Sequence, residues 1–263
     1  MPPASTDLAA LLGPPASLAL FLLCVALATF AQTLSGFAFG LVFLSLVASL
    51  DLASVADAAN VATVLTLANA WAYFRAHRQP VPWPLMKPAI LTSCVGVGLG
   101  LALLHWLSAG ATTALKLLLG AVIVLCALVL LRRGAVRATL APPRQFAAAG
   151  LVSGLMGGLF GTSGPPIVYH LYRQPLGLDV VRRGLLLMFA ANALTRIALN
   201  VPTGGFSLRA VVLAAIALPL VQVLTRLALR LQPHVPAAAL RWGVAALLVA
   251  TGGSLVVAAL HAR

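Results

Sequence analysis

Two short segments of the chain hold residue types that could bind a small anion. The first is Gln32-Thr33-Leu34-Ser35-Gly36, and the second runs from Gly157 to Pro166. Amide and hydroxyl groups donate hydrogen bonds, and glycine lets backbone N–H groups approach a ligand closely. A helix that starts after each segment would add free N–H groups at its N-terminus, where the helix dipole favours negative charge. The candidate binding residues are Gln32, Thr33, Ser35, Gly36, Gly161, Thr162, Ser163 and Gly164.

Amides inside apolar runs and one arginine extend this candidate site. Leu67-Ala68-Asn69-Ala70 is echoed by Ala190-Ala191-Asn192-Ala193. Polar side chains within membrane-spanning segments usually face the interior of the helix bundle, so Asn69 and Asn192 are predicted to be symmetry-related wall residues of the site. Hydrogen bonding between helices is the alternative for both, and for Asn60. Arg196 is a candidate counter-charge, unless its side chain extends to the membrane surface.

A catalytic interpretation of the second segment is also open. Gly161-Thr162-Ser163-Gly164 matches G-x-S-G, the nucleophile motif of intramembrane rhomboid proteases. A nucleophilic serine needs a base within hydrogen-bond reach, whereas the later histidines, His234 and His261, are expected at the membrane edges. We therefore predict that the chain is not an enzyme and keep an intramembrane serine protease as the alternative. The histidines have no partners at metal-ligand spacing, so we predict neither a metal nor another cofactor.

The composition indicates a membrane protein. Of the 263 residues 62% are hydrophobic and 8% are charged, and the mean hydropathy is +1.06. Soluble domains carry about 25% charged residues, so this chain cannot cover a water-facing surface, and soluble enzymes and disordered chains are excluded. The net charge of +13 would suit a nucleic-acid partner. In a membrane protein, however, basic residues gather in cytoplasmic loops, so we predict lipid surroundings and no nucleic acid.

The chain contains eight apolar runs. They cover residues 17–50, 54–74, 89–107, 114–131, 145–171, 184–200, 208–228 and 237–260. The first would make a helix of roughly 51 Å, far longer than the ~30 Å hydrocarbon core of a bilayer. The first and fifth runs also contain the two polar, glycine-rich segments, so each is predicted to form two half-helices. The spacings Gly150-x-x-x-Gly154 and Gly96-x-x-x-Gly100 instead predict close helix packing.

The basic residues predict how the runs cross the membrane. Thirteen of the 17 fall in four clusters at 75–88, 132–144, 173–183 and 226–241. All four lie on one side only if residues 145–171 turn back as a hairpin, and the positive-inside rule makes that side cytoplasmic. The length of the run 17–50, and its symmetry with the run 145–171, predict a second hairpin there.

The predicted fold is an all-α polytopic membrane protein with two inverted repeats, each a broken-helix hairpin followed by three transmembrane helices. Residues 1–16 form an N-terminal tail, 17–131 the first repeat, 132–144 a basic cytoplasmic linker and 145–263 the second repeat. Ser35-Gly36 and Ser163-Gly164 correspond, and an aspartate, Asp51 or Asp179, follows fifteen residues after each glycine. Inverted repeats are the architecture of many secondary transporters.

Two segments resemble a known family. TFAQTLSGFAFGLVFLSLV (29–47) and GLVSGLMGGLFGTSGPPIVYHLY (150–172) look like the two repeat motifs of the TauE/SafE sulfite-exporter family. The first departs from the motif at Ala38, where a glycine is common, and at Ser45-Leu46, where a proline is common. The resemblance implies a multi-pass transporter of the bacterial inner membrane that handles small sulfur-containing anions such as sulfite and organosulfonates.

The sequence thus predicts a secondary transporter that binds a small anion and works by alternating access. A non-transporting membrane scaffold is a further alternative to the protease, and the sequence leaves a homodimer open.

Overall fold

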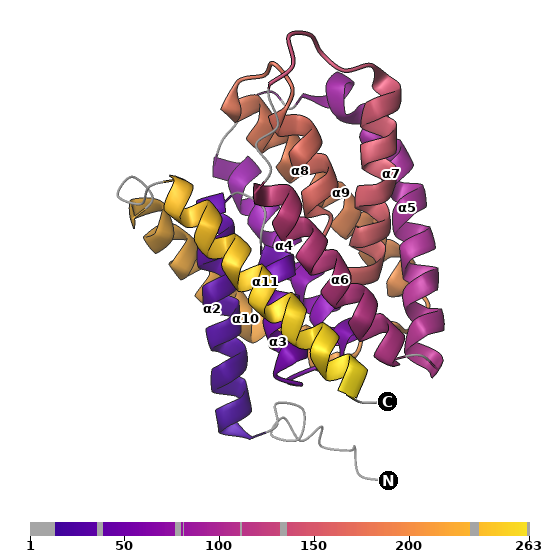
Figure 1. The fold of residues 1–263 in the computed structure, drawn as a ribbon, viewed down its shortest axis with the longest axis vertical. Coiled ribbons are helices and arrows are strands. Elements are labelled where there is room, and N and C mark those ends of the chain that lie inside the picture. Colours follow the sequence, from indigo (N-terminus) through magenta and orange to yellow (C-terminus); the bar gives the residue numbers. More distant parts are fainter. Residues whose placement is uncertain are drawn as a thin grey trace.

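The computed structural model describes residues 14–35, 39–76, 80, 82–110, 112–131, 136–231 and 237–261. Within these ranges all regular secondary structure is helical, and the helices follow the predicted apolar runs (Figure 1). The helices are α2 (Pro15–Ser35), α3 (Phe39–Ser49), α4 (Val55–Ala76), α5 (Trp83–Gly110), α6 (Thr112–Leu131), α7 (Pro143–Phe160), α8 (Gly164–Tyr172), α9 (Leu178–Asn200), α10 (Leu208–Leu231) and α11 (Ala237–His261). Each interrupted run yields two helices, and α5 and α9 begin earlier than their apolar runs.

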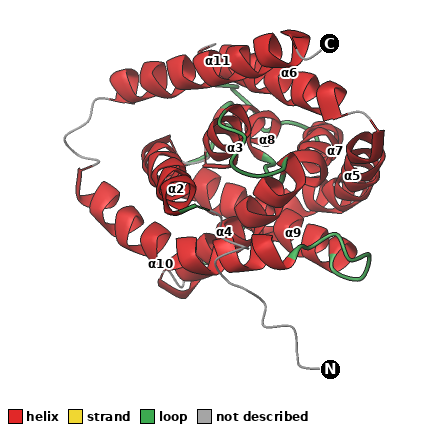
Figure 2. Cartoon of the chain, turned by 90° about the horizontal axis from the view of Figure 1, so that it is seen from below, coloured by secondary structure: helices red, strands yellow, loops and turns green. Residues whose placement is uncertain are grey.

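The two short helices that follow the interruptions lie inside the bundle. Seen end-on, α3 and α8 are surrounded by longer helices (Figure 2). Nearly every residue of α3 is buried, and α8 buries Gly164, Pro165, Ile167, Val168 and Leu171. A helix that is apolar all round is suited to such an interior position. The interrupted runs therefore supply the centre of the molecule.

Three helices in the described residues are long and apolar enough to cross a membrane, namely Pro15–Gln32 of α2, Trp83–Ser108 of α5 and Leu208–Ala228 of α10. On α5, Leu91, Val95 and Leu99 are exposed between exposed tryptophans at positions 83 and 106. These tryptophans are roughly 35 Å apart along the helix, which suits aromatic side chains at the two faces of a bilayer. The chain is a helical membrane protein.

The second interrupted run turns back on itself. Helix α7 ends where Gly161 adopts a left-handed conformation (φ 65°) and donates its N–H to the Gly157 carbonyl. The prolines after Gly164 then start α8, because proline suits the first turn of a helix. At the other end, the Phe146 and His170 rings lie 4.5 Å apart, and Arg137 N donates to Arg173 O (2.8 Å). The chain thus leaves this run beside the point where it enters.

Contacts between loops bring basic clusters to one end of the bundle, the upper end in Figure 1. The Arg137–Arg173 hydrogen bond joins the clusters at 132–144 and 173–183, and Arg183 Nη1 donates to the Pro80 carbonyl (2.8 Å). At the opposite end, Lys116 pairs with Asp51 (2.7 Å) and Arg209 donates to the Leu52 carbonyl (3.2 Å). The described contacts therefore place three of the four clusters together, as the charge pattern predicts.

Glycines join α5 and α7, as their spacing predicts. A Cβ atom added to Gly154 would overlap the Ser93 carbonyl, and one added to Gly96 would overlap the Leu151 carbonyl. The two helices run parallel, because the residue numbers of facing positions increase together along both of them. Gly150 faces Ala89, Gly154 faces Ser93 and Gly158 faces Val97. Such close backbone approach is typical of small-residue packing between membrane helices.

Gly154→Ala is expected to destabilise the protein by about 1–3 kcal/mol, because its methyl group can fit only if the two helix backbones separate. Thermal unfolding in detergent should show a lower midpoint for this variant. Gly98→Ala is the matched control on α5, since its Cβ would meet only Leu199 Cδ1 at 3.8 Å. Equal midpoints for the two variants would contradict this account of the α5–α7 contact.

Candidate functional site

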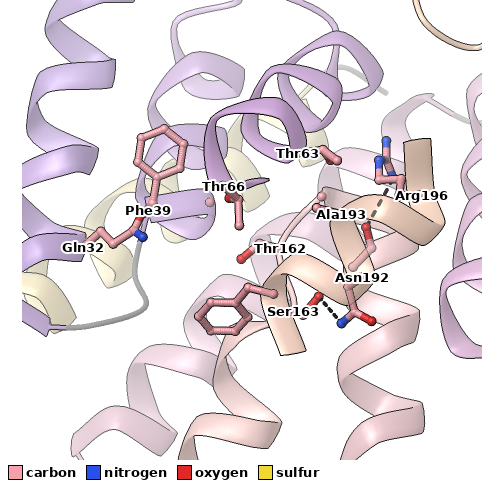
Figure 3. A pocket seen from close by; sticks show the side chains of 13 residues that line it. Gln32, Phe39, Thr63, Thr66, Thr162, Ser163, Asn192, Ala193 and Arg196 are labelled. Carbon is pink, nitrogen blue, oxygen red and sulfur yellow. Dashed lines mark hydrogen bonds between the residues drawn. The ribbon is translucent and has the colours of Figure 1, made fainter. Parts of the chain in front are cut away.

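A polar pocket lies where the two interrupted segments meet. It has about 400 Å³ of empty space, counting space open to the surroundings, and α2, α3, α4, α7, α9 and the α7–α8 turn all contribute to it. Its lining residues are Gln32, Phe39, Gly40, Thr63, Thr66, Gly157, Gly161, Thr162, Ser163, Phe189, Asn192, Ala193 and Arg196. Figure 3 shows Gln32 and Phe39 on one side, Asn192 and Arg196 on the other, and Thr162 between them.

The pocket brings together six of the predicted site residues: Gln32, Gly161, Thr162, Ser163, Asn192 and Arg196. Gly164 starts the buried helix α8 next to the pocket. Asn69 instead lines a smaller neighbouring pocket, which shares Gln32 and Phe39 with the first. Gly36 and the side chains of Thr33 and Ser35 lie outside the part of the chain that the structure describes.

The start of α3 and the turn after α7 pack closely where they border this pocket. A Cβ atom on Gly40 of α3 would overlap the Thr162 side chain, and a Cβ atom on Gly161 would overlap the Ala59 carbonyl of α4. Gly161 also needs its left-handed backbone, which glycine adopts without steric penalty. Both glycines therefore allow the turn after α7 to fit against α3 and α4.

Arg196 is the most deeply buried charge at the pocket, with a relative exposure of 1%. Its Nη1 donates to the carbonyls of Gly157 (3.3 Å) and Gly158, and its Nη2 donates to Asn60 Oδ1 (3.1 Å). All three acceptors are neutral, and Nε is buried without a hydrogen-bond partner in the described structure. The side chain thus points into the bundle and does not extend to the membrane surface.

The chain has four acidic residues, and the three that the structure describes lie away from the pocket. Asp51 pairs with Lys116, Asp57 accepts a hydrogen bond from Ser207 (2.5 Å), and Asp179 is exposed. Among the described residues, the guanidinium of Arg196 therefore has no ion-pair partner. A buried cation is strongly stabilised by a nearby negative charge, so an anion bound in the pocket would complement it.

Ser163 and Asn192 form the lower wall of the pocket in Figure 3. Asn192 Nδ2 donates to Ser163 Oγ (2.6 Å), and Ser153 donates to the Ser163 carbonyl. The Asn192 carbonyl oxygen is buried without a partner in the described structure. The partner of the Ser163 hydroxyl is thus an amide, which cannot act as the base that a serine nucleophile needs.

Seven lining residues are not among the predicted site residues: Phe39, Gly40, Thr63, Thr66, Gly157, Phe189 and Ala193. The two threonines belong to a polar series on α4, Asn60, Thr63, Thr66 and Asn69, in which every third residue is polar. This spacing could have identified the face of α4 that turns inward, because residues three apart are neighbours on a helix. Since three residues fall short of a full 3.6-residue turn, the series winds around α4 and its ends meet different partners.

The fold and the pocket define the class of the protein: a helical membrane protein with a polar site enclosed between interrupted helices. The sequence profile of the family described as Sulfite exporter TauE/SafE matches residues 21–255, and the chain belongs to this family of membrane transporters. A curated relative named "Probable sulfite/organosulfonate exporter TauE", from Cupriavidus necator, is 33% identical over 234 residues, or 89% of this chain and 91% of the relative. No solved structure gives a significant match.

The contact of Gly40 with Thr162 can be tested with a double-mutant cycle. Gly40→Ala should lower the unfolding midpoint, because its methyl group overlaps the Thr162 side chain. Thr162→Gly removes that side chain, so the double variant should be less destabilised than the sum of the two single variants. Additive effects in thermal unfolding would show that α3 and the α7–α8 turn do not touch at this point.

Proposed function

We propose that the protein is a secondary transporter of a small sulfur-containing anion, of the sulfite or organosulfonate type, and that it works by alternating access. The observation that carries this proposal is the Arg196 guanidinium, which is buried at the pocket and whose partners among the described residues are all neutral. The amide of Gln32 and the hydroxyls of Thr66 and Thr162 line the same space, whereas the Thr63 hydroxyl donates to the Ala59 carbonyl. Hydrogen bonds from charged and neutral donors suit the oxygens of a sulfite or sulfonate group.

The proposed transport mechanism uses two inverted repeats, residues 17–131 and 145–263, joined by the linker 132–144. In support, each interrupted run places a short helix, α3 or α8, inside the bundle, and residues at both interruptions line the pocket. Many secondary transporters bind substrate where two such repeats meet, at helices broken near the middle of the membrane. Motion of one part of the bundle against another would expose the pocket to each side in turn.

Replacing Arg196 tests the proposed site. Flux of radiolabelled sulfite into proteoliposomes should fall by about 10- to 100-fold at low sulfite in Arg196→Gln, since a hydrogen bond to a charged group is worth about 1.5–3 kcal/mol. Arg196→Lys should also transport poorly, because lysine lacks the planar fork of donors.

The matched control is Lys116→Gln, which removes a cation from the partly exposed ion pair with Asp51. It should transport at the wild-type rate. Circular dichroism and a monodisperse elution profile would establish that each variant is folded. Wild-type protein that is folded but moves neither sulfite nor methanesulfonate would refute the proposal.

We also propose that the chain lies in the bacterial inner membrane with its basic loops in the cytoplasm. In a variant whose three cysteines are replaced by alanine, Gly177→Cys and Thr203→Cys would report the two ends of the bundle. Gly177 has open space around it and lies beside the basic loops, whereas Thr203 lies in the α9–α10 turn at the opposite end.

A membrane-impermeant thiol reagent should label Thr203→Cys in intact cells, and Gly177→Cys only after the membrane is permeabilised. Labelling of Gly177→Cys in intact cells would reverse the proposed orientation.

A further inference from the structure

A buried hydrogen-bond network connects Arg196 with the turn between α9 and α10. Asn60 Oδ1 accepts hydrogen bonds from Arg196 Nη2 (3.1 Å) and Asn200 Nδ2 (3.0 Å). The amide nitrogen of Asn60 donates to the Gly205 carbonyl (2.8 Å), and Asn200 Nδ2 donates to the same carbonyl (3.2 Å). Asn60, Arg196 and Asn200 are each 1% exposed. Asn60 is therefore the bridge between a residue that lines the pocket and a loop at the surface.

The far end of this network is a tightly fitted turn. Gly205 N donates to the Asn200 carbonyl (3.0 Å), and a Cβ atom on Gly205 would overlap the Asn200 side chain. Next to it, Ser207 donates to Asp57 on α4 (2.5 Å). The turn itself is exposed, with Val201 at 53%. The turn thus lies at the end of the bundle opposite the basic loops, where hydrogen bonds join it to α4 and to the end of α9.

An anion in the pocket would weaken the link between Arg196 and Asn60. Hydrogen bonds from a charged donor are about twice as strong as neutral ones, and a bound anion both neutralises the guanidinium and competes for its N–H groups. Asn60 would then keep only its neutral partners, Asn200 and Gly205. The unpaired Nε of Arg196 shows that the guanidinium has donor capacity left for such a ligand.

We propose that Asn60 is a positioning residue that couples occupancy of the pocket to opening of the α9–α10 turn. In the structure it holds Arg196 towards the turn and keeps the turn closed. When a bound anion draws the guanidinium away from Asn60, the neutral hydrogen bonds of Asn60 and Asn200 alone hold Gly205 in the turn. The turn then opens more readily, and the site opens to the end opposite the basic loops. This inference rests on the proposed transport function, for which it supplies one of the two gates.

Hydrogen exchange measured by mass spectrometry tests the coupling on the full-length protein in detergent. Sodium sulfite, compared with sodium chloride of equal ionic strength, should speed exchange in residues 199–208 by about tenfold, the effect of losing one hydrogen bond to a charged group. Residues 174–180, at the other end of α9, should not respond.

Two variants of Asn60 should act in opposite directions. Asn60→Asp places a carboxylate against Arg196, so the turn should stay protected in sulfite and the KM for sulfite should rise by about tenfold. Asn60→Leu removes the bridge, so the turn should exchange rapidly without sulfite. Thr251→Val is the control, because the Thr251 hydroxyl bonds only within α11 and its loss should leave the sulfite response unchanged.

The outcomes separate the two proposals. Wild-type protein that transports sulfite without any change of exchange in residues 199–208 would overturn the coupling and leave the transport function standing. The same holds if Asn60→Asp and Asn60→Leu retain the wild-type response, since Asn60 would then have a structural role only. A wild-type protein that neither binds nor transports sulfite would overturn both.

Discussion

The burial of one positive charge constrains the interior of this protein. A guanidinium in apolar surroundings is costly unless its donors are satisfied, and Arg196 meets two backbone carbonyls and one amide. The carbonyls belong to Gly157 and Gly158, within the last four residues of α7. Carbonyls in the last turn of a helix lack partners inside it, and although the Gly157 carbonyl also accepts the Gly161 N–H, the end of α7 leaves both carbonyls accessible to Arg196. The interruption of the second apolar run and the arginine on α9 therefore depend on each other.

Small residues make this arrangement possible. Gly158 packs its backbone against α5, since a Cβ atom there would overlap the Val97 carbonyl, while Gly157 leaves room for Ser163. The same two residues offer their carbonyls to Arg196. Helix packing, the shape of the turn and the binding of a charge are thus combined in one dipeptide. A larger side chain at either position would disturb more than one of these contacts.

Much of this organisation could be predicted from the sequence, because apolar run length and glycine spacing act locally. They predicted the helices, both interruptions and the α5–α7 contact. The two polar segments led to four pocket residues, and the polar residues within the run 184–200 led to two more, Asn192 and Arg196. The separation of Asn69 from Asn192 could not be predicted, since it depends on the rotation of α4 against α9. The bridge from Arg196 through Asn60 to Gly205 joins residues 136 and 145 positions apart along the chain. Which residues pair over such distances depends on how the helices pack together, and this cannot be derived from any single segment.

The parallel packing of α5 and α7 has a mechanical consequence. Helix α5 precedes the basic linker and α7 follows it, yet their backbones touch at successive glycines. Interiors packed at this density transmit strain and resist sliding, so we expect these two helices to move together. In the proposed alternating-access mechanism, α5 and α7 would belong to the same body, so the boundary between bodies would not coincide with the linker. A boundary between moving parts would therefore separate one of these two helices from the rest of its own half of the chain.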